Sequence, residues 1–316
     1  MLNLVQGQDE GVRFLRRLIE GHITSPLLLV GQEGVGKKFS VLEAAKEAFS
    51  RGDSSDTFHA TQIDLGNHPD LTLVNREPDD AEIKVDAIRD LVHSVYNYPT
   101  YAPHRYIVID GADYLNAAAA NTLLKTLEEP PNIVRFVLLA ESVRGVLPTI
   151  RSRCGVVRYR TLPEAFILAR ISRFETDAAK ALVLTRLAEG SVGRALGYWA
   201  SGRLRLRDQV QELLKPELLK APASLFTAVD SIGSDLALGL CFLDHVIHDI
   251  LMITVDPSRI TNIDTPEKIT ALRETLGASA ALEIQRRLRD VQRYLDQGVR
   301  INLSAHVKSA LLGVGN

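Results

Sequence analysis

A glycine-rich segment near the N-terminus has the composition of a phosphate-binding loop. It follows the apolar run Leu27–Val30 and reads Gly31-Gln32-Glu33-Gly34-Val35-Gly36-Lys37-Lys38. Glycines let backbone N–H groups curl around phosphate oxygens, and a helix that begins here adds positive potential. Lys37 stands where the phosphate-binding lysine of such a loop belongs. The segment predicts a site for the phosphates of ATP or ADP; the alternative is a glycine turn that only joins a strand to a helix.

The residue after Lys37 departs from what ATP hydrolysis requires. This position normally carries Ser or Thr, whose hydroxyl ligates magnesium, but here it is Lys38. An ammonium group cannot ligate a cation. We therefore expect ATP or ADP to be bound, if at all, without efficient turnover.

A second acidic motif indicates the same defect. Tyr106–Asp110 is an apolar run that ends in an acid, and Asp110 could hold magnesium through water. The Glu that activates the attacking water should come next, but Gly111 stands there. Loss of a positioned general base costs about 10²–10⁴ in rate. Asp113 is either a substitute base or an acid that the helix dipole favours at a helix start.

Buried strands must position these residues. Short apolar runs without alternation are typical of strands covered on both faces of a parallel sheet. They recur in the first half of the chain, at Leu27–Val30, Leu71–Val74, Ile107–Ile109 and Phe136–Leu139, with Val156–Arg160 as a fifth candidate.

Helical patterns lie between the apolar runs and dominate after residue 160. Asn116 can cap a helix that reaches Glu129, where Pro130 ends it. Alternating strands and helices predict a doubly wound α/β domain over 1–160. We expect a small helical lid at 161–204 and an all-helical domain at 205–316. The helices predicted in these two parts are 165–173, 177–188, 193–200, 209–214, 236–252, 266–276, 281–295 and 305–312.

Composition excludes several classes of protein. The formal net charge of −2 over 316 residues is too acidic for a protein that coats DNA alone. Two cysteines, Cys154 and Cys241, are too few for a disulfide scaffold or a Cys-rich zinc module and fit a reducing compartment. The N-terminus lacks the pattern of a signal peptide, and no apolar run approaches the length of a membrane span. We therefore expect a cytoplasmic protein without membrane contact.

The stretch from Val108 to Cys154 resembles the clamp-loader branch of the AAA+ family. The matching segments are Ile109-Asp110, Ala118–Pro131, Arg135–Leu138 and Leu147–Cys154. Gly66–Asp70 and Gly190–Leu196 are also similar to family segments, the latter to sensor 2. The resemblance implies an AAA+ P-loop parallel-sheet domain, a helical lid and an all-helical collar that joins subunits.

The family's Ser-Arg-Cys segment implies a role for Arg153. In clamp loaders this arginine reaches the ATP of the adjacent subunit. A guanidinium is permanently charged and can grip phosphate oxygens at two points, and such a finger is worth about 10³–10⁵ in rate. The alternative is a surface arginine at a helix-to-strand corner. We interpret Cys154 as a small buried residue rather than a nucleophile.

Other family features are missing or ambiguous. Relatives usually carry four zinc-binding cysteines after the P-loop helix, but 50–70 has none, so we expect no zinc. We interpret His59 and His68 there as surface or structural residues. The sensor 1 strand ends without the Thr or Asn that orients water. Arg194 stands at sensor 2, where it either touches a phosphate or braces the lid.

An intact Ser-Arg-Cys beside a defective ATP site resembles delta-prime-type rather than gamma-type subunits. This implies a fixed subunit of the DNA polymerase III sliding-clamp loader, with weak or absent ATPase activity. The implied partners are gamma/tau-type and delta-type subunits, the sliding clamp and primer–template DNA. One alternative is a gamma/tau-like or phage-type motor subunit that hydrolyses its own ATP. Another is a non-replicative nucleotide switch or regulatory DNA-binding module on the same fold.

Overall fold

Five parallel strands form the centre of the first of two units, Met1–Pro163. The computed structural model describes residues 2–50, 57–77, 80–296, 299 and 301–312. The strands are β1 (Leu27–Val30), β2 (Leu71–Asn75), β3 (Arg105–Asp110), β4 (Val134–Ala140) and β5 (Gly155–Arg158). Each of the five predicted runs is therefore a strand, with ends that differ by no more than two residues.

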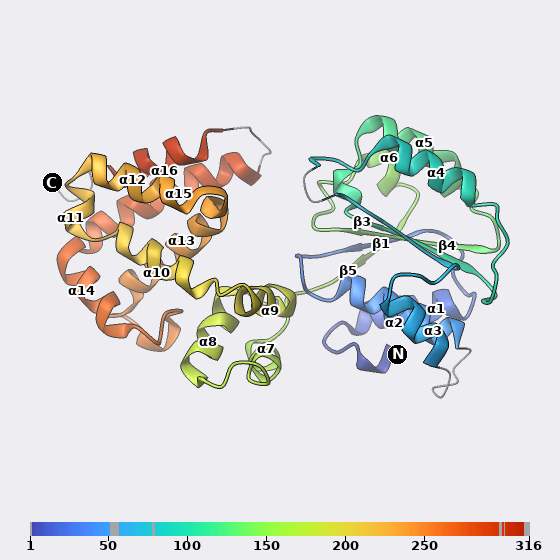
Figure 1. The fold of residues 1–316 in the computed structure, drawn as a ribbon, viewed down its shortest axis with the longest axis horizontal. Helices are drawn as coiled ribbons and strands as arrows, with labels where there is room; N and C mark the ends of the chain where they lie inside the picture. Colours follow the sequence, from blue (N-terminus) through green and yellow to red (C-terminus); the bar gives the residue numbers. More distant parts are fainter. Residues whose placement is uncertain (1, 51–56, 78–79, 297–298, 300, 313–316) are drawn as a thin grey trace. The chain divides into compact units, whose positions relative to one another are not determined.

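Helices cover both faces of this sheet (Figure 1). One face carries α1 (Asp9–Ile19), α2 (Lys37–Phe49) and α3 (Thr57–Asp64); the other carries α4 (Val85–Ser94), α5 (Ala117–Glu128) and α6 (Pro148–Arg151). Two apolar clusters fill the two layers, and β1 supplies both because successive side chains point to opposite faces. Leu27 and Leu29 join one cluster, and Leu28 and Val30 join the other. The predicted doubly wound α/β fold is confirmed.

The strand order places the glycine-rich loop at a point where α/β sheets bind ligands. The order is β2-β3-β4-β1-β5, so β1 lies between the last two strands of the chain. Ligand sites in such sheets lie at the carboxyl ends of the strands, where the order reverses. At this edge Val30 pairs with Ala140, and Asn75 pairs with Asp110.

Helices make up the second unit, Glu164–Asn316, as far as the structure describes it. They are α7 (Glu164–Ile171), α8 (Ala178–Leu187), α9 (Val192–Ala200), α10 (Leu204–Leu213), α11 (Pro216–Leu219), α12 (Pro222–Ile232), α13 (Leu236–Met252), α14 (Pro266–Leu276), α15 (Ala278–Asp296) and α16 (Leu303–Leu311). Short 3₁₀ turns lie at Leu2–Leu4, Ala112–Tyr114, Gly233–Asp235 and Pro257–Arg259. All eight predicted helices are present, whereas α11 and α12 were not predicted.

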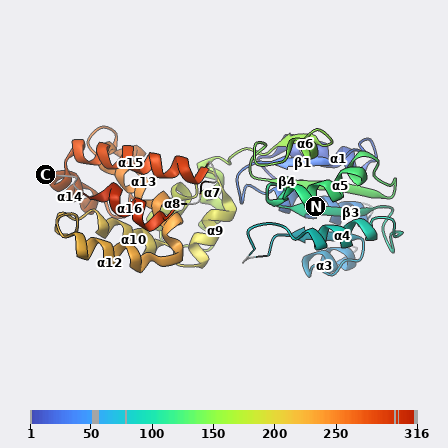
Figure 2. The same cartoon turned by 90° about the horizontal axis from the view of Figure 1, so that it is seen from above.

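The apolar helix α13 is central to the second unit. It packs against α10, α14, α15 and α16 (Figure 2). The stretch 222–252 is long and apolar enough to cross a membrane by length and composition. The Gly233–Asp235 turn divides it into α12 and α13, and both helices contribute side chains to the apolar core. We interpret the stretch as core helices.

One apolar cluster extends over most of the second unit. Val183 and Leu187 of α8 belong to the same cluster as residues of α10 and α12 to α16. The helix α8, which was predicted as part of the lid, therefore shares a core with the helices predicted as a collar. The boundary between the two units lies at Pro163, close to the predicted 160, and the division near 204 stays a prediction.

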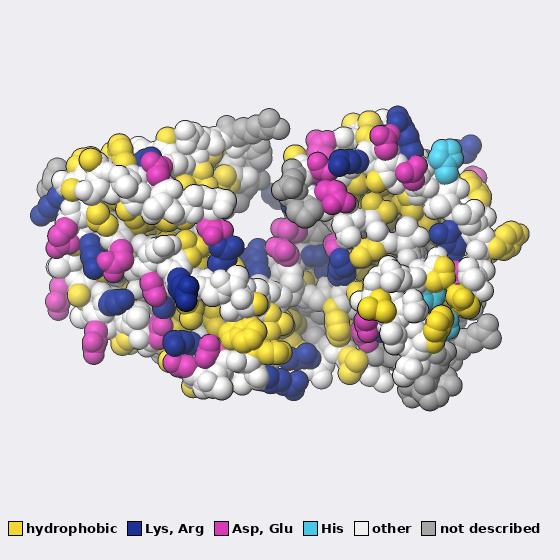
Figure 3. Space-filling model, in the orientation of Figure 1, with side chains coloured by type: hydrophobic (Ala, Val, Ile, Leu, Met, Phe, Trp, Pro, Cys, Tyr) yellow, Lys and Arg dark blue, Asp and Glu magenta, His cyan; other side chains and the backbone are white. Residues whose placement is uncertain are grey.

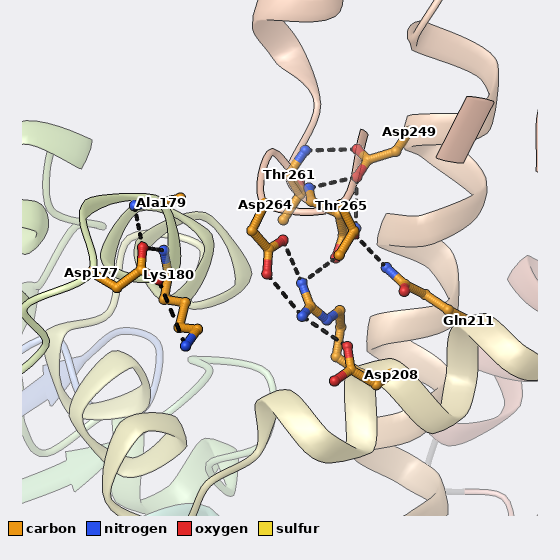
Figure 4. Close-up of polar contacts among 11 residues, drawn as sticks. Asp177, Ala179, Lys180, Asp208, Gln211, Asp249, Thr261, Asp264 and Thr265 are labelled. Carbon is orange, nitrogen blue, oxygen red and sulfur yellow. Dashed lines mark hydrogen bonds and ion pairs between the residues drawn. The ribbon is translucent and has the colours of Figure 1, made fainter. Parts of the chain in front are cut away.

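A buried polar network fixes the loop between α13 and α14 (Figure 4). Asp249 is fully buried and accepts backbone N–H groups of Thr261 and Asn262, both at 2.7 Å. Arg207 donates to both carboxylate oxygens of Asp264, at 2.7 and 3.0 Å. Burial acts to lower the pKa of Arg207, but the hydrogen bonds and charge of Asp264 raise it overall.

Charged side chains are mixed on the surface. On the face drawn in Figure 3, Lys and Arg are interspersed with Asp and Glu over both units. This distribution agrees with the net charge of −2. Any contact with nucleic acid through this face would therefore be local.

Candidate functional site

The glycine-rich loop connects β1 to α2 with the backbone of a phosphate-binding loop. Gly34 and Gly36 have φ angles of 74° and 101°, a left-handed conformation that favours glycine. Gly31 is needed for a different reason, because a Cβ atom there would come within 2.4 Å of the Tyr159 carbonyl oxygen. The three glycines thus shape the turn and let β5 pass close to it.

Gln8 braces this loop from outside the motif. Its side-chain amide donates to the carbonyl oxygens of Val35, at 3.2 Å, and Arg160, at 2.7 Å. Its side-chain oxygen accepts the Arg160 N–H at 3.1 Å. The side chain is only 5% exposed. No sequence motif marked this residue.

Lys37 is folded onto its own loop. Its ammonium donates to the carbonyl oxygen of Gly31 and, at 2.9 Å, to that of Gln32. Burial lowers the pKa of Lys37, although nearby carboxylates act to raise it. These carboxylates belong to Glu141, Asp110, Asp113 and Glu33. The lysine at the phosphate-binding position of the motif therefore lies among acids, whose charge acts against that of a phosphate.

Lys38 forms an ion pair with Asp110. Its Nζ lies 3.2 Å from Asp110 Oδ2 and donates to Asn75 Oδ1 at 3.4 Å. The helix start thus reaches across the sheet edge to the ends of β3 and β2. The two residues that lie at the magnesium position of the motif contact each other directly.

The backbone at Gly111, where the catalytic Glu of the motif is missing, does not suit a residue with a side chain. Gly111 has φ 99°, and a Cβ atom there would lie 2.7 Å from Cδ2 of Tyr114. Any other residue would meet both strain and a clash. Asp113 Oδ2 accepts the backbone N–H of Glu141 at 2.9 Å, which ties it to the end of β4. Asp113 therefore has a structural contact, and its role as a substitute base stays untested.

Arg153 lies at the corner between α6 and β5. Its guanidinium donates from Nε to Glu128 Oε1 at 2.7 Å and from Nη2 to the same oxygen. Nη1 donates to the Thr149 carbonyl oxygen at 2.8 Å. The side chain is 28% exposed. It borders a cavity of about 380 Å³ that is also lined by Thr24, Pro26, Glu128, Pro131 and Arg135.

The structure also gives the environments of Cys154 and Arg194. Burial raises the pKa of the Cys154 thiol to about 12, so the reactive thiolate is disfavoured, as expected for a packed residue. Arg194 belongs to the second unit, where its Nη1 lies 3.8 Å from Glu189 Oε2. The structure describes each unit by itself, so the contact of Arg194 with a nucleotide stays a prediction.

The two histidines in the region 50–70 are buried structural residues. His59 Nδ1 and His68 Nε2 are 2.8 Å apart, and the His68 ring stacks on Phe49 with centroids 4.4 Å apart. The Asp70 backbone N–H donates to His68 Nδ1 at 3.1 Å. The Asp70 carboxylate accepts N–H groups from Thr100, Tyr101 and Ala102. The structural alternative for these histidines is the correct one, and neither is a surface residue.

Comparison with known proteins gives the same family as the motifs. A family model described as DNA polymerase III, delta subunit, matches residues 7–163. DNA polymerase III subunit delta' of Escherichia coli K12 is 28% identical over 219 residues, which are 69% of this chain and 65% of that protein. The corresponding protein of Bacillus subtilis is 32% identical over 185 residues, 57% of this chain and 56% of the relative. The chain thus spans less than two thirds of these relatives.

A solved structure is similar over nearly the whole chain. It is that of a DNA polymerase III gamma subunit-related protein from Thermotoga maritima, with 19% identity and a TM-score of 0.48. The alignment covers 96% of this chain and 97% of that one. The family model and the delta' relatives confirm the resemblance read from the Val108–Cys154 motifs. The chain is similar to the clamp-loader branch of the AAA+ family and, within it, to the DNA polymerase III delta-prime subunits.

Proposed function

We propose that this chain is a fixed, delta-prime-like subunit of a sliding-clamp loader and lends Arg153 to ATP bound by a neighbouring subunit. It hydrolyses little or no ATP itself. Its partners are gamma/tau-type and delta-type loader subunits, the sliding clamp and, in the assembled complex, primer–template DNA. It works in the cytoplasm. The similarity to delta-prime subunits supports the loader assignment. The geometry of two sites supports a chain that supplies Arg153 to a neighbour but does not hydrolyse ATP itself.

The contrast between these two sites carries the proposal. At the chain's own loop, Lys38 is paired with Asp110 at 3.2 Å, and Gly111 replaces the general base. At the other site, Arg153 is partly exposed and keeps a charged, forked group at the edge of a cavity. The first site lacks groups for hydrolysis, whereas the second has the group that stabilises charge on a transferring phosphoryl.

Arg153 would act through its positive charge and the paired N–H donors of its guanidinium. As the bond to the leaving phosphate breaks, negative charge grows on the phosphate oxygens, and a guanidinium at hydrogen-bond distance stabilises that charge. Lysine supplies a point charge without the paired N–H donors. The contacts of Arg153 with Glu128 and Thr149 orient the group before a neighbour binds.

Reconstitution of the loader tests this role. The chain is assembled with gamma/tau-type and delta-type subunits, and DNA-dependent ATP turnover is measured with Arg153→Ala. We expect the loss of turnover at the one ATP site that Arg153 serves, with assembly and ATP binding retained. Arg151→Ala is the matched control, because Arg151 is an exposed arginine two residues away. Unchanged turnover in the Arg153→Ala complex would refute the proposal.

The motor-subunit alternative is tested on the chain alone. Magnesium-dependent ATP turnover by the purified protein, abolished by Lys37→Ala, would favour that alternative. We expect no turnover above that of the Lys37→Ala variant.

A further inference from the structure

The ion pair of Lys38 and Asp110 bears on which cation the nucleotide loop accepts. In P-loop proteins, magnesium is held by the hydroxyl after the loop lysine and by an acid at the end of a neighbouring strand. Here the first position is Lys38 and the second is Asp110, and their charged atoms are 3.2 Å apart. The acid that would hold the metal is therefore already neutralised by a cation of the chain.

These residues do not fit a magnesium ion. Magnesium demands near-octahedral oxygen ligands at about 2.0–2.1 Å. Lys38 offers no lone pair while charged, and its ammonium would repel a dication at the same carboxylate. Asn75 could supply an amide oxygen, but that oxygen accepts from Lys38 at 3.4 Å. The side-chain oxygens of Asp110 and Asn75 thus both contact the lysine.

The loop still has the parts that bind phosphate. Gly34 and Gly36 keep the left-handed turn, and α2 begins at Lys37 and runs for 13 residues. Two ammonium groups stand at its first two positions. The Lys38 side chain is 43% exposed and its ammonium has three N–H donors, so it can bind a phosphate oxygen while it stays beside Asp110.

We propose that Lys38 takes the place of magnesium in this site. A nucleoside diphosphate or triphosphate binds the loop without a divalent cation, and the Lys38 ammonium neutralises part of the phosphate charge. Free magnesium then lowers the apparent affinity, because it binds the nucleotide in solution and the complex fits the site less well. A nucleotide held in this way has no metal to polarise its phosphates, so it has a structural role.

The experiment uses the full chain and a fluorescent N-methylanthraniloyl-ADP as the probe. Binding is followed by fluorescence anisotropy in EDTA and in excess Mg²⁺. The wild type should bind in EDTA and bind more weakly in excess Mg²⁺. Lys38→Thr restores the hydroxyl, and in this variant Mg²⁺ should tighten binding by about tenfold or more, a usual size for coupled ligands.

Two variants serve as controls. Lys84→Thr removes a lysine that also pairs with an aspartate, at 2.9 Å from Asp80, and should behave as the wild type does. Lys37→Ala should lose binding in both buffers. Circular dichroism of each variant checks that it is folded.

The wild-type titration alone can overturn the inference. Binding that requires Mg²⁺ would refute the replacement of the metal by Lys38, and the lack of saturable binding in either buffer would refute a nucleotide site. A Lys38→Thr variant that is folded, binds the probe and shows no dependence on Mg²⁺ would also refute it. None of these outcomes bears on Arg153, so the proposed loader function is tested separately, by the Arg153→Ala variant.

Discussion

Arg153, at the corner between α6 and β5, pairs with Glu128 at the end of α5, with its Nε and Nη2 donating to one carboxylate oxygen. The group that we assign to a neighbour's ATP is therefore preoriented by an acid of its own chain. Glu128 belongs to the Leu-Glu-Glu-Pro-Pro run that marks the family resemblance. The contact gives this run a physical role.

We predict that Glu128 positions Arg153. In the reconstituted loader, Glu128→Ala should lower kcat for DNA-dependent ATP hydrolysis and leave KM unchanged, because the contact matters only when phosphate charge develops. Glu128→Gln keeps an accepting oxygen and should retain most of the activity. Glu129→Ala, at the exposed neighbouring position, is the control. Equal losses in the Ala and Gln variants would argue against positioning.

We predict that Gly111 cannot be replaced without a loss of stability. Gly111→Ala adds a Cβ atom 2.7 Å from the Tyr114 ring in a left-handed backbone, whereas Gly66→Ala meets only the backbone strain. In urea denaturation followed by circular dichroism, Gly111→Ala should cost about 1–3 kcal/mol more than Gly66→Ala. Gly111→Glu should therefore not restore ATP turnover. Equal costs at the two glycines would show that Tyr114 moves aside.

We predict that His68 makes the first unit less stable in acid. Burial lowers the pKa of His68 in the folded chain, and the nearby Asp70 charge only partly opposes this. Because the unfolded chain takes up the proton first, the free energy of unfolding should decrease as the pH falls below about 6.5.

Urea denaturation between pH 7.5 and 5, followed by circular dichroism, measures this effect. His68→Gln should reduce the slope, while His22→Gln, at an exposed histidine, should not. The pKa of His104 is lowered too, by burial and by Arg135, so part of the slope should remain in the His68 variant. An unchanged slope in His68→Gln would contradict the prediction.

We predict that Asp249 is required for the second unit to fold stably. Asp249→Ala removes a buried acceptor of three hydrogen bonds, two from backbone N–H groups and one from the Asn262 side chain at 2.6 Å. The cost should be about 3 kcal/mol or more, because hydrogen bonds to a charged group are strong and the donors stay buried. Asp244→Ala, on the exposed side of the same helix, should cost little.

The single tryptophan makes this measurement specific to the second unit. Trp199 lies in α9, with its ring centroid 5.4 Å from that of Phe174. Its fluorescence should report the earlier unfolding of Asp249→Ala. The same signal is an internal reference for the Gly111 and His68 variants, since both changes lie in the first unit. A Trp199 transition that is unchanged in Asp249→Ala would contradict the assigned role.

Local patterns were sufficient to predict most elements of the fold. The strands β1, β3 and β4 were apolar runs because both faces of the sheet are covered there. Asn116 caps α5 as expected, accepting from the Ala119 N–H at 2.9 Å. The helices α11 and α12 were missed because Pro216 and Pro222 look like breaks. Both prolines stand in the first turn of their helices, where the missing N–H costs nothing.

The sequence predicted the residues of the site but not their contacts. Lys38 was identified as unsuited to hydrolysis and Asp110 as an acid that could hold magnesium, yet their contact depends on the order of strands. A chain position alone does not reveal that β2 and β3 end side by side, which brings Asn75 to the same lysine. Glu128 was visible as a motif residue, but its contact with Arg153 joins residues 25 positions apart.

The hydrogen bonds of Gln8 connect the glycine-rich loop to the segment where the chain leaves the first unit. One amide holds the Val35 carbonyl of the loop and both backbone groups of Arg160, three residues before the boundary at Pro163. The loop cannot shift relative to this exit without breaking hydrogen bonds worth about 0.5–1.5 kcal/mol each. A displacement of the segment after Arg160 would thus displace the glycine-rich loop as well. A ligand bound in that loop would in turn restrict the motion of this segment.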